Sequence, residues 1–153
     1  MKVLISACLL GKNVRWNATN KKDEDLIGWA EREGIQLISV CPENSVLGTP
    51  RPPIKLEKIN ETIIAHAKNL DVFKELTQEC ENISLEHPDA VGFIGIAGSP
   101  TCGISVGVRN LGRTIKGFLH QALSFPTTEI NQLRSENNRK IFIERIKKFQ
   151  KTL

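Results

Sequence analysis

Three short apolar runs can be recognised along the chain, at residues 3–7, 35–40 and 90–97. Each is bounded by polar or turn-forming residues, a pattern typical of buried strands in a parallel sheet. The cysteines that follow these runs are Cys8, Cys41 and Cys102. Ligands of open parallel sheets bind beyond the carboxyl ends of the strands. We therefore expect the three cysteines to meet at one site.

The segment between the first two runs predicts a helix over residues 23–33. Leu26, Ile27 and Ala30 form an apolar stripe on it, and Gly34 is suited to its end. Strand, helix and strand together make a βαβ unit, so we expect the first two strands to be parallel, with a right-handed crossover.

The middle of the chain is harder to assign. Residues 42–53 are too rich in proline for a regular element, and we expect a stiff loop that holds Glu43 and Arg51 at fixed positions. Residues 63–80 are mostly helical in character. The residues expected on one side of that helix are Leu70, Phe73 and Leu76.

Beyond Cys102 the pattern is weaker. Residues 104–108 favour a short strand, and residues 111–125 are ambiguous. Thr127 or Thr128 is a candidate cap for a final amphipathic helix. The apolar residues of that helix are Phe142, Ile146 and Phe149.

These elements predict one α/β domain over residues 1–153: a small, mostly parallel, Rossmann-like sheet with flanking helices and a C-terminal amphipathic helix. The 153 residues include 40% hydrophobic and 25% charged residues, as in ordinary globular domains. No apolar run approaches the roughly 20 residues of a membrane-spanning helix, so we expect no membrane partner.

Four cysteines and no signal-peptide pattern favour a cytoplasmic protein whose thiols bind metal or react. The net charge of +4 is mild, and much of it lies in residues 134–151. Nucleic acid is therefore not an expected partner, although the basic C-terminal helix leaves such a contact open. We expect a monomer.

Three sequence blocks carry a more specific signal: residues 6–11, residues 41–43 with Thr49-Pro50-Arg51-Pro52-Pro53 downstream, and residues 99–103. In this order they resemble the thiouracil desulfidase family, over the N-terminal two thirds of the chain. Where that family has Arg-Tyr-Asp-Gly after the first block, this chain has Arg15-Trp16-Asn17-Ala18. Its C-terminal part also departs from the family pattern.

The resemblance implies that Cys8, Cys41 and Cys102 hold a [4Fe-4S] cluster with one open iron. It also implies removal of sulfur from thiouracil or a related thiolated pyrimidine, a small-molecule partner, as hydrosulfide. Glu43 and Ser99 match motif positions thought to assist the chemistry. We expect a non-redox reaction in which Glu43 deprotonates water and Ser99 supports it by a hydrogen bond.

Other interpretations stay open at this point. The three cysteines could be inert packing residues, or zinc ligands with Cys80, His66 or His87 as a fourth. Glu43 could accept backbone N–H groups of its own loop, and Ser99 could be a turn cap.

Arg51 could bind a substrate oxygen or only anchor its loop. We assign no role to Cys80, nor to His66, His87 and His120, which match no motif. The alternative function is a non-catalytic iron-sulfur or zinc-binding module, as a sensor or an RNA-associated protein. The missing acidic residue at Asn17 and the basic final helix motivate it.

Overall fold

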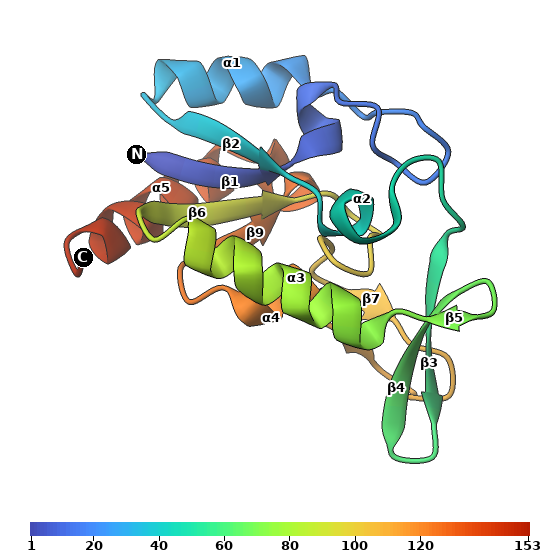
Figure 1. Ribbon diagram of the computed structural model, residues 1–153. Coiled ribbons are helices and arrows are strands. Elements are labelled where there is room, and N and C mark those ends of the chain that lie inside the picture. The colour runs from blue at the N-terminus through green and yellow to red at the C-terminus, as the bar shows by residue number, and fades with distance from the viewer.

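The protein is built on a parallel sheet of four strands, as the apolar runs predict. The computed structural model describes residues 1–153. The strand order is β2-β1-β6-β9, and every neighbouring pair is parallel (Figure 1). The strands are β1 (Lys2–Ser6), β2 (Gln36–Val40), β6 (Ala90–Gly95) and β9 (Thr127–Glu129).

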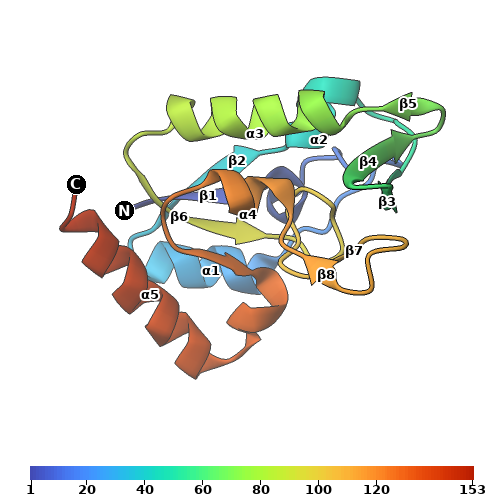
Figure 2. The same ribbon diagram turned by 90° about the horizontal axis from the view of Figure 1, so that it is seen from below.

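Helices cover both faces of this sheet (Figures 1 and 2). On one face lie α1 (Glu24–Arg32) and α5 (Glu136–Gln150); on the other lie α3 (Phe73–Glu86) and α4 (Phe118–Ala122). Successive side chains of a strand point to opposite faces. Val3 and Ile5 accordingly pack in the core that includes α1 and α5, whereas Leu4 packs in the other core. The result is a Rossmann-like three-layer α/β fold.

The predicted βαβ unit is confirmed. The side chain of Asp23 caps α1 by accepting a hydrogen bond of 2.9 Å from the N–H of Leu26. Gly34 follows the helix with a φ of 66°, a backbone conformation that glycine adopts without strain. Strands β1 and β2 then pair in parallel over their whole length.

The prediction for residues 42–80 is wrong in two places. The proline-rich stretch begins with a short helix, α2 (Pro42–Leu47), because Pro42 occupies its first turn, where a missing N–H costs nothing. The first part of the predicted helix instead belongs to a small antiparallel sheet, which also includes the preceding strand and projects from the end of the main sheet (Figure 1). Its strands are β3 (Ile54–Ile59), β4 (Thr62–Ala67) and β5 (Leu70–Asp71).

Two local features explain the antiparallel sheet: a tight turn between β3 and β4, and buried residues that alternate with more exposed ones along β4. Asn60 takes a φ of 54° between β3 and β4, which suits asparagine in a hairpin. Ala65 and Ala67 alternate inward, whereas Leu70, expected on a helix face, is 63% exposed. The helix itself begins at Phe73 and continues past Cys80 to Glu86.

The C-terminal part is also more irregular than expected. The predicted short strand is β7 (Val106–Gly107), paired with β8 (Thr114–Ile115). A 3-10 helix, η2 (Ile130–Arg134), follows β9. Near the N-terminus, a second one, η1 (Ala7–Leu10), follows β1.

The final helix α5 begins later than expected. Its cap is Ser135, which accepts from the N–H of Asn138, whereas Thr127 and Thr128 lie in β9. Phe142 and Ile146 are buried on α5, as its stripe predicts. None of the helices combines the length and apolar composition needed to cross a membrane.

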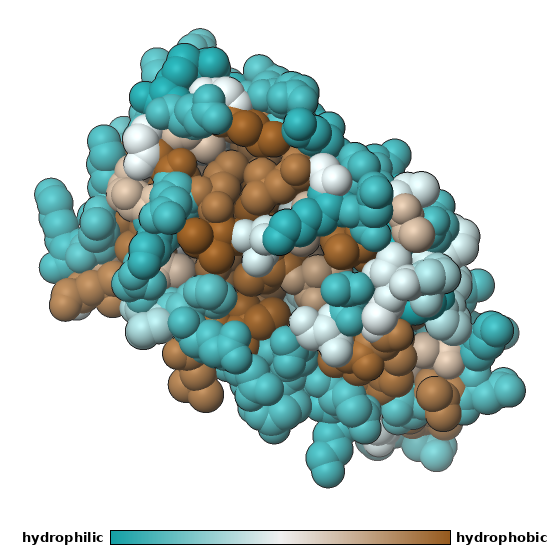
Figure 3. Space-filling model, turned by 45° about the horizontal axis from the view of Figure 1, so that its top comes forward, coloured by the Kyte–Doolittle hydropathy of each residue, from teal (hydrophilic) through white to brown (hydrophobic).

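One edge of the main sheet is only partly covered. Strand β2 pairs with β1 alone, and residues Leu37 to Ser39 are half-buried. On the face of the molecule that carries α1 and β2, apolar side chains gather in the centre and polar ones border them (Figure 3). The cysteines lie at a different place, beyond the carboxyl ends of the strands.

Candidate functional site

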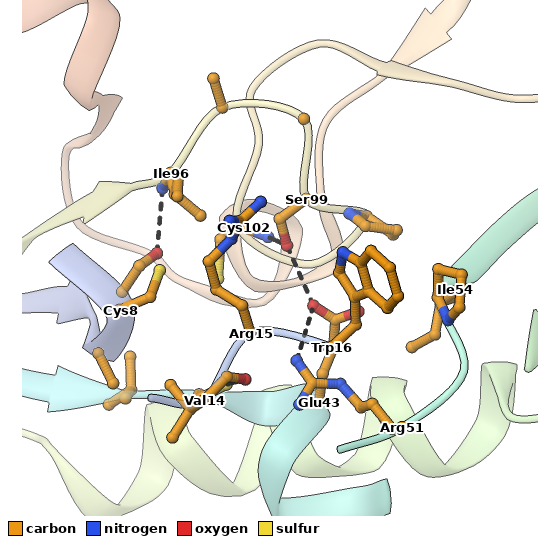
Figure 4. A pocket seen from close by; sticks show the side chains of 18 residues that line it. Cys8, Val14, Arg15, Trp16, Glu43, Arg51, Ile54, Ile96, Ser99 and Cys102 are labelled. Carbon is orange, nitrogen blue, oxygen red and sulfur yellow. Dashed lines mark hydrogen bonds and ion pairs between the residues drawn. The ribbon is translucent and has the colours of Figure 1, made fainter. Parts of the chain in front are cut away.

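The three predicted cysteines meet at a single cavity. Cys8 follows β1 in η1, Cys41 follows β2 as the N-cap of α2, and Cys102 lies in the loop after β6. All three line a cavity of about 320 Å³ at the carboxyl ends of these strands (Figure 4). The same cavity is lined by Glu43, Arg51 and Ser99. The structure therefore brings together the three cysteines and the three residues expected to act beside them.

Cys8 and Cys41 are positioned by the ends of strands β1 and β2. Ser6, the last residue of β1, accepts a hydrogen bond of 3.0 Å at its Oγ from the N–H of Ile96. This bond ties the end of β1 to the segment that follows β6. Cys41 Sγ lies 3.9 Å from the carbonyl oxygen of Val14, in the loop after η1.

The Cys102 loop is shaped by Ser99. The Ser99 Oγ accepts hydrogen bonds from the N–H groups of Thr101, at 3.3 Å, and Cys102, at 3.1 Å. The Ser99 carbonyl oxygen accepts a third, of 2.8 Å, from the N–H of Gly103. Ser99 thus does cap a turn, as one interpretation of the sequence has it, and its hydroxyl also faces the cavity (Figure 4).

The C-terminal part of the chain holds this loop from behind. The N–H of Leu119 donates to the carbonyl oxygen of Thr101 at 2.9 Å, and the N–H of Gly117 donates to that of Gly103 at 2.8 Å. His120 Nε2 lies 2.7 Å from the carbonyl oxygen of Cys102, and its ring is buried. These contacts position Cys102 from a region in which the sequence shows no motif.

Two residues that support the Cys102 loop, His120 and Gly95, are not predicted from the sequence. His120 matches no motif, and burial lowers the pKa of its imidazole, so it acts here as a neutral donor to the backbone. Gly95 faces the same carbonyl, and a methyl group there would overlap the Cys102 oxygen. No local pattern predicts either contact, because each joins segments that are distant in the sequence.

Glu43 is bound by the Cys102 loop and not by its own backbone. Its Oε2 accepts hydrogen bonds from Ser99 Oγ at 3.2 Å and from Thr101 Oγ1 at 3.3 Å. The Arg51 Nη2 lies 4.0 Å from the same oxygen. Burial raises the pKa of the Glu43 carboxyl, and the charge of Arg51 and the two hydroxyls oppose that increase.

Arg51 anchors its loop and has one buried donor without a partner. Its Nη1 donates to the Gly48 carbonyl oxygen at 3.2 Å and to Thr49 Oγ1 at 3.0 Å. The side chain is only 4% exposed, and its Nε is buried without a hydrogen-bond partner. The anchoring interpretation is thus supported by geometry.

The three thiols lie in surroundings that disfavour an isolated thiolate. Burial, with a smaller effect of Cys41, raises the pKa of Cys8 to about 11. Burial raises the pKa of Cys102 to about 12 and also raises that of Cys41. Thiolates are the form that binds metal, so a cationic group in the cavity would offset this cost.

The donor set fits a group larger than one ion. No three His, Cys, Asp or Glu side chains are arranged to hold a single metal ion. Yet three thiols share one cavity, whose volume is about ten times the ~30 Å³ that a water molecule occupies in the liquid. A cavity of this size, lined by three thiols from separate strand ends, has room for an iron-sulfur cluster, whose usual ligands are thiolates.

The zinc interpretation also lacks its fourth ligand, because Cys80, His66 and His87 do not line the cavity. His66 pairs with Glu57 at 2.9 Å in the antiparallel sheet, and His87 lies at the far end of α3.

Cys80 lies in an apolar core, although its neighbours in the sequence are Glu79 and Glu81. Cys80 is fully buried on α3 between Leu76 and Ile83, in the same apolar core as Cys102. Burial raises the pKa of its thiol most, followed by Cys102; the effect of neighbouring Glu79 comes after these. The helical spacing of four and three residues is the signal that predicts this burial.

Fold and site together define an α/β protein with a three-cysteine cavity at the carboxyl edge of its parallel sheet. Residues 3–132 match the model of the 2-thiouracil desulfurase family. The chain belongs to this family. The match extends past the two thirds in which the motifs lie, through α4 and β9, and ends before α5.

A solved structure supports the same assignment. The chain is similar to one described as the [4Fe-4S]-dependent thiouracil desulfidase TudS, with 27% sequence identity and a TM-score of 0.67. The similarity covers 86% of this chain and 92% of that one. No curated protein matches the sequence. The predicted family and the predicted α/β fold are both confirmed.

Proposed function

We propose that this protein is a [4Fe-4S]-dependent desulfidase that removes sulfur, as hydrosulfide, from thiouracil or a related thiolated pyrimidine. Family membership supports a desulfidase, and the description of the similar structure supports an iron-sulfur cofactor. The observation that carries the proposal is the buried carboxylate of Glu43, which is joined by two hydroxyls to the Cys102 loop inside the three-cysteine cavity.

Cys8, Cys41 and Cys102 would hold the cluster. A cluster held by three thiolates would leave one iron without a protein ligand, and that iron would supply Lewis acidity toward the soft sulfur of the substrate. The burial of Cys8 and Cys102 keeps bulk water from these sulfurs. The supporting contacts of α4 keep the third ligand in position without occupying the cavity.

Glu43 would take the proton from the attacking water. Both hydroxyl hydrogen bonds and the contact with Arg51 involve Oε2, which leaves Oε1 free to accept that proton. A pKa raised by burial brings a carboxylate closer to the operating pH, where a general base is most effective. The Ser99 and Thr101 hydroxyls fix the orientation of the carboxylate.

The reaction balances without any change of oxidation state. The oxygen of water forms a bond to the thiocarbonyl carbon, and the carbon–sulfur bond breaks. One proton of the water passes to Glu43 and later to solvent, and the other passes to the departing sulfur, which leaves as hydrosulfide. The products are the oxo-pyrimidine and hydrosulfide, and no external electron donor or acceptor is needed. Arg51, which lines the cavity, would bind the remaining carbonyl oxygen of the substrate.

The test is anaerobic reconstitution with iron and sulfide, followed by incubation with 2-thiouracil in water labelled with ¹⁸O. We expect bound iron and sulfide, release of hydrosulfide, and uracil that carries the label. Bound iron without hydrosulfide release would instead support the non-catalytic module. Release of hydrosulfide without label in uracil would contradict the hydrolytic route.

A further inference from the structure

Trp16 is a large aromatic residue that the fold leaves half-exposed at the cavity. Its residue surface is 47% exposed, and it lines the cavity with the three cysteines. Figure 4 shows its indole ring beside Glu43 and Arg51, between Ser99 and Ile54, whereas Cys8 lies on the opposite side. The second tryptophan, Trp29, is 5% exposed on α1 and lies outside the cavity.

The backbone around Trp16 is fixed by hydrogen bonds. The N–H of Arg51 donates to the Trp16 carbonyl oxygen at 2.9 Å. This bond joins the Trp16 loop to the loop that carries Arg51. On either side, Arg15 and Thr19 close a turn with a backbone bond of 3.1 Å, and Ala18 N–H donates to Arg15 at 2.8 Å. The backbone that carries the indole is therefore fixed at the cavity before a ligand arrives.

An exposed indole beside a charged and hydrogen-bonding wall suits a flat, polar heterocycle. One face of such a ring can stack on the indole while its edge atoms meet Glu43 and Arg51. The neighbouring wall is apolar and includes Pro53, Ile54 and Pro100. Stacking of a base on an aromatic side chain is tolerant of ring substituents, because it uses the π-face and not the edge.

We propose that Trp16 is the stacking surface for the heterocyclic ring of the substrate, and that it makes the cavity selective for planar aromatic thiocarbonyl compounds. This proposal rests on the proposed function. In it, Trp16 binds the ring and takes no part in proton transfer, which belongs to Glu43. Loss of the indole should therefore weaken binding and leave the chemical step nearly unchanged.

The experiment compares the reconstituted parent with Trp16→Leu, which removes the π-face, and Trp16→Tyr, which retains one. Base stacking is worth enough that Trp16→Leu should raise KM for 2-thiouracil about 5- to 150-fold. Its kcat should stay within about threefold of the parent, as expected for loss of uniform binding. Trp16→Tyr should recover most of the affinity. A KM of Trp16→Leu within about twofold of the parent, too small a change for loss of stacking, overturns the proposal.

A binding measurement separates this proposal from the proposed function. Uracil is titrated into the parent and into Trp16→Phe, which retains Trp29, while tryptophan emission is recorded. Emission should change in the parent and not in the variant, whether or not the parent releases hydrosulfide. If hydrosulfide is absent but this difference is seen, the desulfidase proposal fails and the stacking proposal stands. If uracil changes neither emission, the stacking proposal fails.

Discussion

Replacing Glu43 by glutamine removes the proposed base while it preserves the shape of the site. Glutamine has the same length, and its amide oxygen can occupy the Oε2 position, where Ser99 and Thr101 donate at 3.2 and 3.3 Å. Its amide nitrogen then takes the Oε1 position, which has no proton-accepting capacity at neutral pH. The variant should therefore fold, bind iron and bind substrate.

The expected loss of folding stability is smaller than the expected loss of catalytic rate, so the two effects can be told apart. A hydrogen bond to a charged group contributes about 1.5–3 kcal/mol and a neutral one about 0.5–1.5, so two weakened bonds cost about 2 kcal/mol in stability. Relief of the burial of a charge offsets part of this cost, since Glu43 is only 13% exposed. Loss of a positioned general base lowers kcat about 100- to 10,000-fold, or about 3–5 kcal/mol of activation free energy.

The assay measures hydrosulfide release and uracil formation at saturating 2-thiouracil, together with iron content and thermal melting. Glu57→Gln is a matched control, because that carboxylate pairs with His66 on the antiparallel sheet and does not line the cavity. It should retain the parental rate. If Glu43→Gln retains its iron and its rate falls less than about threefold, Glu43 is a structural anchor and the proposed mechanism is wrong.

Three further predictions address the ligands and their support. Anaerobic cluster assembly should fail in each of three variants, Cys8→Ala, Cys41→Ala and Cys102→Ala. Cys80 lies outside the cavity, so Cys80→Ala should retain the parental iron content. An equal loss of iron in Cys80→Ala would contradict a three-cysteine site. Gly95→Ala should lower the free energy of unfolding in urea by about 3 kcal/mol or more, because its methyl group meets the Cys102 carbonyl. Gly107→Ala, where the space is open, should change it by less than about 0.5 kcal/mol. His120→Leu should cost about 1–3 kcal/mol in the same assay, since the Cys102 carbonyl loses its donor, and an unchanged midpoint would show that this hydrogen bond contributes nothing.

The sequence alone predicts the framework of the site. Strands β1, β2 and β6 are mainly apolar, and their carboxyl ends are followed by cysteines, so parallel pairing brings these cysteines to one edge. The helix α1 is equally local, with a cap at Asp23 and a stop at Gly34. Such signals need no knowledge of distant contacts.

Tertiary contacts decided the rest. The segment that forms β4 was expected to be a helix, but the hairpin turn at Asn60 and pairing with β3 stabilise a strand there instead. Thr101 and His120 acquire their partners, Glu43 and the Cys102 carbonyl, across 58 and 18 residues of sequence. No periodic pattern encodes a pairing of that kind, because the free energy of the contact depends on where the fold brings the two segments together. The cysteines could therefore be found from the chain itself, whereas the groups that orient them emerge only when the sheet and its loops are assembled.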